Sequence, residues 1–179
     1  QYRNALQHRW GVSEVEDIQA AVNELIAAGE VDPDAVFIRG NSSGGYTALN
    51  AMSELDCFAA GASLYGVTDP AVLNNATHKF ESYYLHWLIG DPVKDSDRYQ
   101  SYAPINKAQS IRCPVIFFQG ELDRVVVPEQ TKRMISVLQE QGVETEVHYF
   151  ADEAHGFRKA ANQQLALNSE LTFYQRFIK

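Results

Sequence analysis

The chain has 179 residues, of which 45% are hydrophobic and 21% are charged, so it is long enough for one domain with a buried core. Its formal net charge is −8, and this acidic balance argues against a nucleic-acid partner, because phosphate binding requires clustered Lys and Arg. No apolar run approaches the ~20 residues of a membrane-spanning helix, so we expect no membrane partner. The two cysteines, Cys57 and Cys113, do not make a disulfide framework.

The first periodic segment predicts a helix that begins at Ser13 and ends at Gly29. Ser13 and Glu16 have the spacing of a capping box, in which the serine is the N-cap residue and the glutamate reaches back to its backbone N–H. The apolar residues that would share one face of this helix are Val15, Ile18, Val22, Leu25 and Ile26.

Short apolar runs predict strands, and helical segments separate them. The predicted strands are residues 35–39, 59–65, 114–118 and 145–150. The predicted helices are 46–55, a segment around 80–88, 128–141 and 162–177. Strands that alternate with helices indicate right-handed crossovers and a parallel sheet. In such a sheet the functional groups lie beyond the carboxyl ends of the strands.

The pattern G-x-S-x-G occurs once, as Gly40-Asn41-Ser42-Ser43-Gly44, between the first predicted strand and a helical segment. In this strand–turn–helix context the pattern raises a serine hydroxyl on a tight turn. Ser43 would need a glycine where Asn41 stands, so Ser42 is the candidate nucleophile. The alternative interpretation is a surface turn or a helix cap.

A serine nucleophile needs a base within hydrogen-bond reach, and the base needs an acid that orients it. His155 follows the last predicted strand and is the candidate base, while Asp123 follows the third strand and is the candidate acid. Other carboxylates also follow strands or lie near His155, namely Glu121, Asp69, Asp152 and Glu153. With Ser42, the segments of Asp123 and His155 would reach the same edge of the sheet, in the order that α/β-hydrolases use.

The remaining histidines do not have the position expected of a catalytic base. His148 alternates with strand residues and is expected to pack in the sheet, and His8 and His86 do not follow the last strand. His78 and Glu81 could share a helical face, but two residues do not make a metal site. We therefore expect no metal and no cofactor.

An oxyanion hole needs at least two N–H donors. The backbone N–H of Ser43 would supply one, helped by the positive end of its helix. The second normally comes from a loop after an earlier strand, and no glycine-rich loop of that kind precedes Ser42 in this sequence.

With these residues in place, the chain resembles the catalytic domain of the prolyl oligopeptidase family of serine peptidases, and is most similar to its acylaminoacyl-peptidase and dipeptidyl-peptidase branch. The matching segments are Trp10-Gly11, residues 40–46, residues 77–84, residues 113–120, Val127-Pro128-Glu129-Gln130 and Ala154-His155-Gly156-Phe157. The resemblance implies an α/β-hydrolase fold, a parallel sheet with flanking helices.

The resemblance also implies a function and partners. Family members cleave short peptides, and a β-propeller caps their hydrolase domain. By resemblance, Val67, Phe80 and Val126 would line the pocket for the residue before the scissile bond, although these three could equally be core residues. A tyrosine on an upstream segment would supply an oxyanion donor.

We therefore expect residues 1–179 to be the C-terminal part of a hydrolase domain, with the propeller and the first half of the sheet upstream. The strand at 35–39 would then be an unprotected edge, and the isolated chain would self-associate through this edge or through exposed helix faces. We expect low activity from these residues alone. The alternatives are a carboxylesterase with the same three residues, or a catalytically silent interaction fragment.

Overall fold

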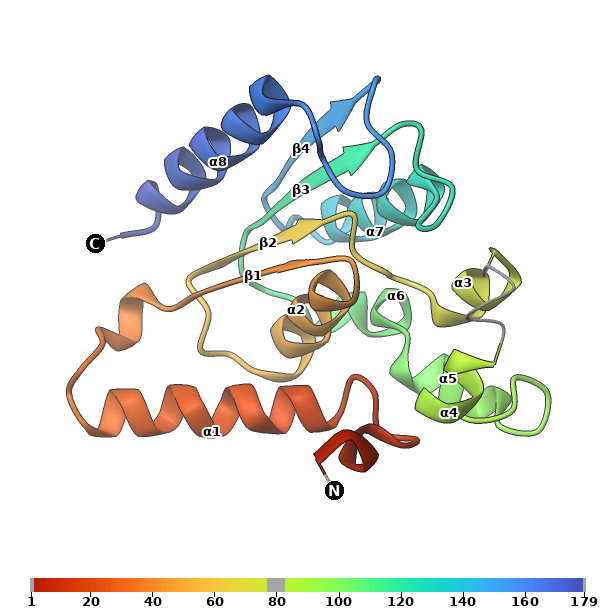
Figure 1. The fold of residues 1–179 in the computed structure, drawn as a ribbon. Coiled ribbons are helices and arrows are strands. Elements are labelled where there is room, and N and C mark those ends of the chain that lie inside the picture. The colour runs from red at the N-terminus through yellow and green to blue at the C-terminus, as the bar shows by residue number, and fades with distance from the viewer. Residues whose placement is uncertain (1, 77–82, 179) are drawn as a thin grey trace.

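The computed structural model describes residues 2–76 and 83–178, and its centre is a parallel sheet (Figure 1). The strands are β1 (Phe37–Asn41), β2 (Ala60–Leu64), β3 (Val115–Gly120) and β4 (Thr145–Phe150), in the spatial order β1-β2-β3-β4. The register aligns Asn41 with Leu64, and Leu64 with Phe118. The carboxyl ends of the strands therefore lie along one edge.

Helices cover both faces of the sheet (Figure 1). One face carries α2 (Ser43–Glu54) and α7 (Pro128–Glu140), with α1 (Ser13–Ala27) packed outside α2, and the other face carries α8 (Ala160–Gln175). The segment between β2 and β3 contains α3 (Pro70–Ala76), α4 (Tyr84–Leu88), α5 (Ser96–Tyr102) and α6 (Pro104–Lys107). The 3-10 turns are η1 (Tyr2–Leu6), η2 (Pro33–Ala35) and η3 (Ala108–Ser110).

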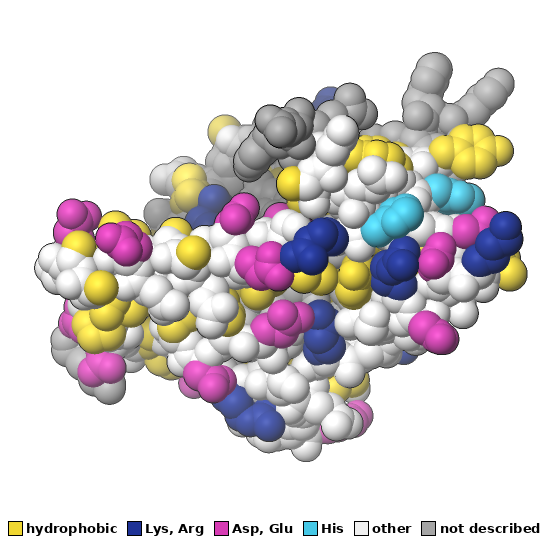
Figure 2. All heavy atoms as spheres, turned by 90° about the horizontal axis from the view of Figure 1, so that it is seen from below, with side chains coloured by type: hydrophobic (Ala, Val, Ile, Leu, Met, Phe, Trp, Pro, Cys, Tyr) yellow, Lys and Arg dark blue, Asp and Glu magenta, His cyan; other side chains and the backbone are white. Residues whose placement is uncertain are grey.

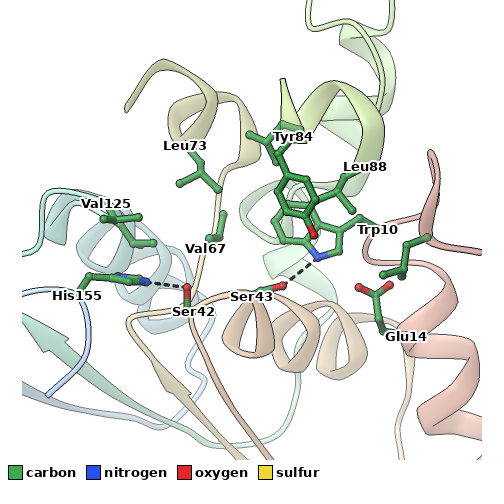
Figure 3. A pocket seen from close by; sticks show the side chains of 13 residues that line it. Trp10, Glu14, Ser42, Ser43, Val67, Leu73, Tyr84, Leu88, Val125 and His155 are labelled. Carbon is green, nitrogen blue, oxygen red and sulfur yellow. Dashed lines mark hydrogen bonds between the residues drawn. The ribbon is translucent and has the colours of Figure 1, made fainter. Parts of the chain in front are cut away.

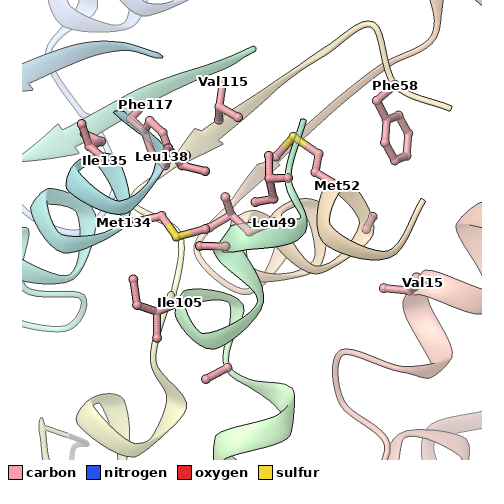
Figure 4. Packing of buried hydrophobic residues seen from close by; sticks show 14 residues of the cluster. Val15, Leu49, Met52, Phe58, Ile105, Val115, Phe117, Met134, Ile135 and Leu138 are labelled. Carbon is pink, nitrogen blue, oxygen red and sulfur yellow. The ribbon is translucent and has the colours of Figure 1, made fainter. Parts of the chain in front are cut away.

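β3 shows why a continuous apolar run forms this sheet. Val115 and Phe117 pack with the α2 and α7 side (Figure 4), whereas Ile116 and Phe118 pack under α8. Every residue of β3 is buried, as expected for a parallel strand with helices on both faces. Full burial of one such side chain stabilises the fold by about 1.5–3 kcal/mol.

The capping box predicted for the first helix is wrong. The N-cap residue is Val12, which makes no side-chain cap bond. Arg9 instead binds both predicted partners: its Nε donates to Ser13 Oγ at 3.0 Å, and its Nη2 donates to Glu16 Oε2 at 2.6 Å. A guanidinium offers several charge-assisted donors, so both side chains bind Arg9 in place of the backbone N–H groups.

Several element boundaries also differ from those predicted. The first strand begins at Phe37 rather than at residue 35, because Pro33–Ala35 forms a turn in which Asp32 Oδ1 accepts from the Asp34 N–H at 2.9 Å. The helix predicted around residues 80–88 is observed as Tyr84–Leu88, and residues 77–82 lie outside the described part of the chain.

The surface carries both signs of charge. Figure 2 shows acidic and basic side chains interspersed on the face seen from below, with hydrophobic side chains between them. Among the described residues, no helix is both long and apolar enough to cross a membrane.

The turn between β1 and α2 depends on glycines at specific positions. A Cβ on Gly40 would lie 2.0 Å from the Gly44 carbonyl oxygen, and a Cβ on Gly45 would lie 2.6 Å from Gly66 Cα. A Cβ on Gly44 would have no atom within 4 Å. Gly40 and Gly45 are thus required by close backbone contacts, whereas Gly44 is not.

We expect Gly45→Ala to destabilise the fold by about 1–3 kcal/mol, because the added methyl group overpacks a backbone contact. Gly44→Ala is the matched control: it lies in open space within a helix, where Ala is favoured over Gly by about 0.5–1 kcal/mol. Urea unfolding of the two variants measures the difference. Equal losses of stability in both would contradict the contact argument.

Candidate active site

Ser42 lies at the sharp bend between β1 and α2, with φ 52° and ψ −115°. A non-glycine residue in such a region costs about 1–3 kcal/mol and persists only where its surroundings hold it. Here the Ser42 N–H donates to the Leu64 carbonyl at 2.9 Å, and the Ser42 carbonyl accepts from the Tyr46 N–H at 3.0 Å. These bonds fix the backbone of Ser42, and its hydroxyl faces the pocket (Figure 3).

The Ser42 hydroxyl belongs to a chain of hydrogen bonds. Ser42 Oγ lies 2.7 Å from His155 Nε2, and His155 Nδ1 lies 2.8 Å from Asp123 Oδ2. Asp123 Oδ1 accepts from the N–H groups of Val125 at 2.8 Å and Val126 at 2.9 Å. With Asp123 accepting on both oxygens, Nδ1 of the imidazole is the donor, so Nε2 can accept the Ser42 proton.

The buried side chain of Gln119 also orients Asp123. Gln119 Nε2 donates to Asp123 Oδ2 at 3.3 Å and to the Val126 carbonyl at 3.1 Å. The Thr131 hydroxyl donates to Gln119 Oε1 at 2.8 Å. Both Gln119 and Thr131 are buried, and a buried polar network of this kind is rigid when its groups are satisfied.

The loop that carries His155 is held by Glu153. This buried carboxylate accepts from the N–H groups of Arg158 at 3.0 Å and Lys159 at 2.9 Å, and from Asn162 Nδ2 at 2.9 Å. The loop turns at Gly156, whose φ is +89°. Glu153 is therefore occupied in joining the loop to the start of α8.

The other carboxylates considered as the catalytic acid have different partners or are exposed. Asp69 accepts from the Ala71 N–H at 2.9 Å in the first turn of α3, Asp152 pairs with Lys159, and Glu121 is exposed. His148 stacks on Phe118 with the ring centroids 5.3 Å apart, as a packed strand residue does. His78 and Glu81 lie outside the described residues.

A pocket of about 400 Å³ opens in front of Ser42 (Figure 3). Val67 and Val126 line it, and Phe80 lies outside the described residues. Most of the other lining side chains are apolar or aromatic, and the lining also includes Leu6, Trp10, Glu14, Ser43, Leu73, Tyr84, Leu85, Leu88, Val125 and His155.

Trp10 forms one wall of the pocket, a role that the sequence analysis did not predict. Its ring stacks on Tyr46 at 3.9 Å, its Nε1 donates to Ser43 Oγ at 3.1 Å, and its carbonyl accepts from the Tyr46 hydroxyl at 3.1 Å. Gly11, with φ +84°, permits this contact, since a Cβ there would lie 2.3 Å from Tyr46 Oη. The pair Trp10-Gly11 before a helix was the available signal.

Glu14 is the one carboxylate among the described residues that line the pocket. Its Oε2 accepts from the Gly11 N–H at 2.9 Å. Burial raises the pKa of Glu14 above its ordinary value of 4.5, and its backbone hydrogen bonds oppose the shift in part. In residues 2–76 and 83–178 no group of three or more His, Cys, Asp or Glu side chains is arranged to hold a metal ion.

The raised pKa of Glu14 gives a sign for the pH dependence of stability. Between the unfolded and folded pKa values the folded state binds more protons, so stability falls as pH rises through this window. Glu14→Gln removes that loss. We expect the melting temperature of the variant, minus that of the wild type, to increase from pH 4 to pH 7. A difference that is constant or falls over this range would contradict the assignment.

The chain is similar in sequence and in fold to known proteins. The model of the prolyl oligopeptidase family matches residues 1–179. The chain is 26% identical over 172 residues to dipeptidyl aminopeptidase BIII of Pseudoxanthomonas mexicana, covering 91% of this chain and 24% of that protein. It is also 26% identical to the acylamino-acid-releasing enzyme of Arabidopsis thaliana, over 84% of this chain and 21% of that protein.

Solved structures give the same result. A puromycin-hydrolyzing peptidase of Mycobacterium tuberculosis superposes with a TM-score of 0.95 at 39% identity, over 98% of this chain and 27% of that one. The acylaminoacyl peptidase of Pyrococcus horikoshii shares the fold, with a TM-score of 0.91 at 21% identity, over 99% of this chain and 30% of that one. The chain thus spans about a quarter of the length of these relatives. It has an α/β-hydrolase fold and belongs to the prolyl oligopeptidase family.

Proposed function

We propose that the chain is the C-terminal catalytic part of a serine peptidase that hydrolyses short peptides through an acyl-enzyme intermediate on Ser42. The observation that carries the proposal is the hydrogen-bonded chain from Ser42 Oγ through His155 to the buried Asp123, with distances of 2.7 and 2.8 Å. A base within hydrogen-bond reach is what a serine hydroxyl needs to become a nucleophile.

The reaction would proceed in two halves. His155 Nε2 takes the Ser42 proton while Oγ attacks the peptide carbonyl, and then gives that proton to the leaving amine as the C–N bond breaks. A water molecule next loses a proton to His155 and attacks the acyl group, and the proton returns to Ser42 Oγ as the ester bond breaks. Asp123 holds the imidazole in the required tautomer and stabilises the imidazolium.

The Ser43 N–H would stabilise the oxyanion. Ser43 is the first residue of α2, so its N–H has no acceptor within the helix and lies at the positive end of the helix dipole. We place the second donor outside this chain, on the upstream part of the hydrolase domain. One such donor contributes about 10²–10³ in rate, so these 179 residues alone should react slowly.

The pocket would accept an apolar side chain next to the scissile bond. Val67 and Val126 are 2% and 0% exposed and line the pocket together with Ser42. Phe80 remains a predicted lining residue of the same pocket. Peptide substrates, an upstream β-propeller and the first half of the sheet are proposed from relatives that are peptidases about four times as long as this chain.

A fluorophosphonate probe tests the proposed chemistry. We expect stoichiometric label on Ser42 in the full-length protein, none in Ser42→Ala, and slow label on the isolated chain. Asp123→Asn should lower kcat by about 10⁴, since it permits the wrong imidazole tautomer. Label on neither form of the protein would overturn the hydrolase proposal.

The choice of substrate separates peptidase from esterase. Aminoacyl anilides and aryl esters present the same acyl group with different leaving groups. We expect the full-length protein to hydrolyse the anilides and Ser42→Ala to hydrolyse neither substrate. Turnover of esters alone would favour a carboxylesterase.

We also propose that the isolated chain self-associates through β1. In the part of the chain that the structure describes, β2 is the only strand paired with β1, so the outer side of β1 is an open edge. Open edges present unpaired N–H and C=O groups to another chain. A second copy of the chain would pair there.

Light scattering over a concentration series measures this association. We expect dimers or larger species in the isolated chain. The double variant Leu167→Gln/Leu171→Gln is the control, because these α8 side chains are 61% and 57% exposed and do not belong to β1. A monomer at high concentration would contradict self-association. Loss of association in the control variant would place the interface on α8 and contradict pairing through β1.

A further inference from the structure

Tyr65 follows β2 directly and has a left-handed backbone, with φ +40°. Such a conformation costs a non-glycine residue about 1–2 kcal/mol. Its N–H donates to the Phe118 carbonyl at 2.7 Å, which holds the chain in this conformation. The side chain is therefore fixed by a constrained backbone at the carboxyl end of the sheet, where Ser42 also lies.

The ring of Tyr65 lies against the imidazole of His155. The two ring centroids are 5.0 Å apart, and the planes are inclined by 67°. The same ring contacts Phe157 at 5.0 Å and 82°, and Phe157 contacts Phe150 at the end of β4 at 4.7 Å. Tyr65 thus connects the loop of His155 to the core under α8.

The hydroxyl of Tyr65 has a partner next to the nucleophile. Asn41 Nδ2 donates to Tyr65 Oη at 3.1 Å, and Asn41 is the residue before Ser42. Burial raises the pKa of Tyr65 above its ordinary value, although the Asn41 bond opposes the shift. The phenol therefore stays neutral and can act as the acceptor at neutral pH.

We propose that Asn41 and Tyr65 form a positioning pair that holds the imidazole of His155 toward Ser42, and this inference rests on the proposed function. Asp123 fixes the imidazole through Nδ1, which still allows the ring to tilt about that bond. The Tyr65 ring restricts the tilt, and the Asn41 bond fixes the Tyr65 ring. Neither residue touches the reacting atoms in this role.

The consequence for catalysis follows from distance. Proton transfer requires Ser42 Oγ and His155 Nε2 to stay near their 2.7 Å separation. A misplacement of about 1 Å can lower the rate of a chemical step by about 10². Loss of the pair should therefore lower kcat and leave KM nearly unchanged, because the pocket walls do not include Asn41 or Tyr65.

The test uses the full-length protein and an aminoacyl anilide. Asn41→Ala and Tyr65→Phe each remove the same hydrogen bond, and we expect each to lower kcat by about 3–10-fold, with no further loss in the double variant. Tyr65→Leu removes the ring and should lower kcat by about 10–100-fold. Tyr65→Phe keeps the ring, so it should retain most of the kcat that Tyr65→Leu loses. That difference separates a positioning role of the ring from a general effect on folding.

Tyr174→Phe is the matched control. Its hydroxyl donates to the Ile38 carbonyl at 3.1 Å and lies outside the pocket lining, so kcat should not change. If the losses of kcat in Asn41→Ala and Tyr65→Phe multiply in the double variant, or if the losses appear in KM, the positioning pair is wrong. Continued fluorophosphonate labelling of Ser42 would then leave the proposed function intact. If Tyr65→Leu does not fold, Asn41→Ala and Tyr65→Phe decide the matter. Absence of label in the wild type overturns the proposed function, and the pair with it.

Discussion

The close contact between the end of β1 and the start of α2 is the constraint on which the site depends. Gly40 lies so near the first turn of α2 that a Cβ would fall 2.0 Å from the Gly44 carbonyl oxygen. Ser42 has no room for a relaxed turn and takes φ 52°. The strained backbone has two results: it directs the Ser42 hydroxyl outward, and it places the Ser43 N–H at the helix N-terminus. Hydrogen bonds to Leu64 and Tyr46 offset the strain.

The opposite side of the site is built from satisfied polar groups. Asp123 is buried and would be costly without partners, but two backbone N–H groups and Gln119 donate to it. Because β3 and the turn after it supply these donors, the orientation of His155 is set by a buried strand and the turn that follows it. Ser42, the proposed nucleophile, thus follows β1, and Asp123, the proposed acid, follows β3 of the same sheet. His155, on the loop after β4, is hydrogen-bonded to both.

Much of this arrangement could be predicted from local pattern. Apolar runs separated by helical segments predict a parallel sheet, and residues directly after its strands, including Ser42, Asp123 and His155, must come to one edge. The capping box failed because Arg9, outside the four-residue pattern, binds both Ser13 and Glu16. Contacts such as that of Tyr65 with His155 depend on a positive φ in a tyrosine, which no propensity predicts.

Ser43 shows how the pocket and the reacting centre are joined. Its hydroxyl accepts from Trp10 Nε1, while its backbone N–H is the proposed oxyanion donor. Trp10 in turn stacks on Tyr46, one turn further along α2. Under the proposed function, a substrate side chain that contacts Trp10 would therefore act on the same helical turn that carries the proposed oxyanion donor. The Trp10–Ser43 hydrogen bond and the Trp10–Tyr46 stacking would then make part of the binding energy of that side chain available at the reacting carbonyl.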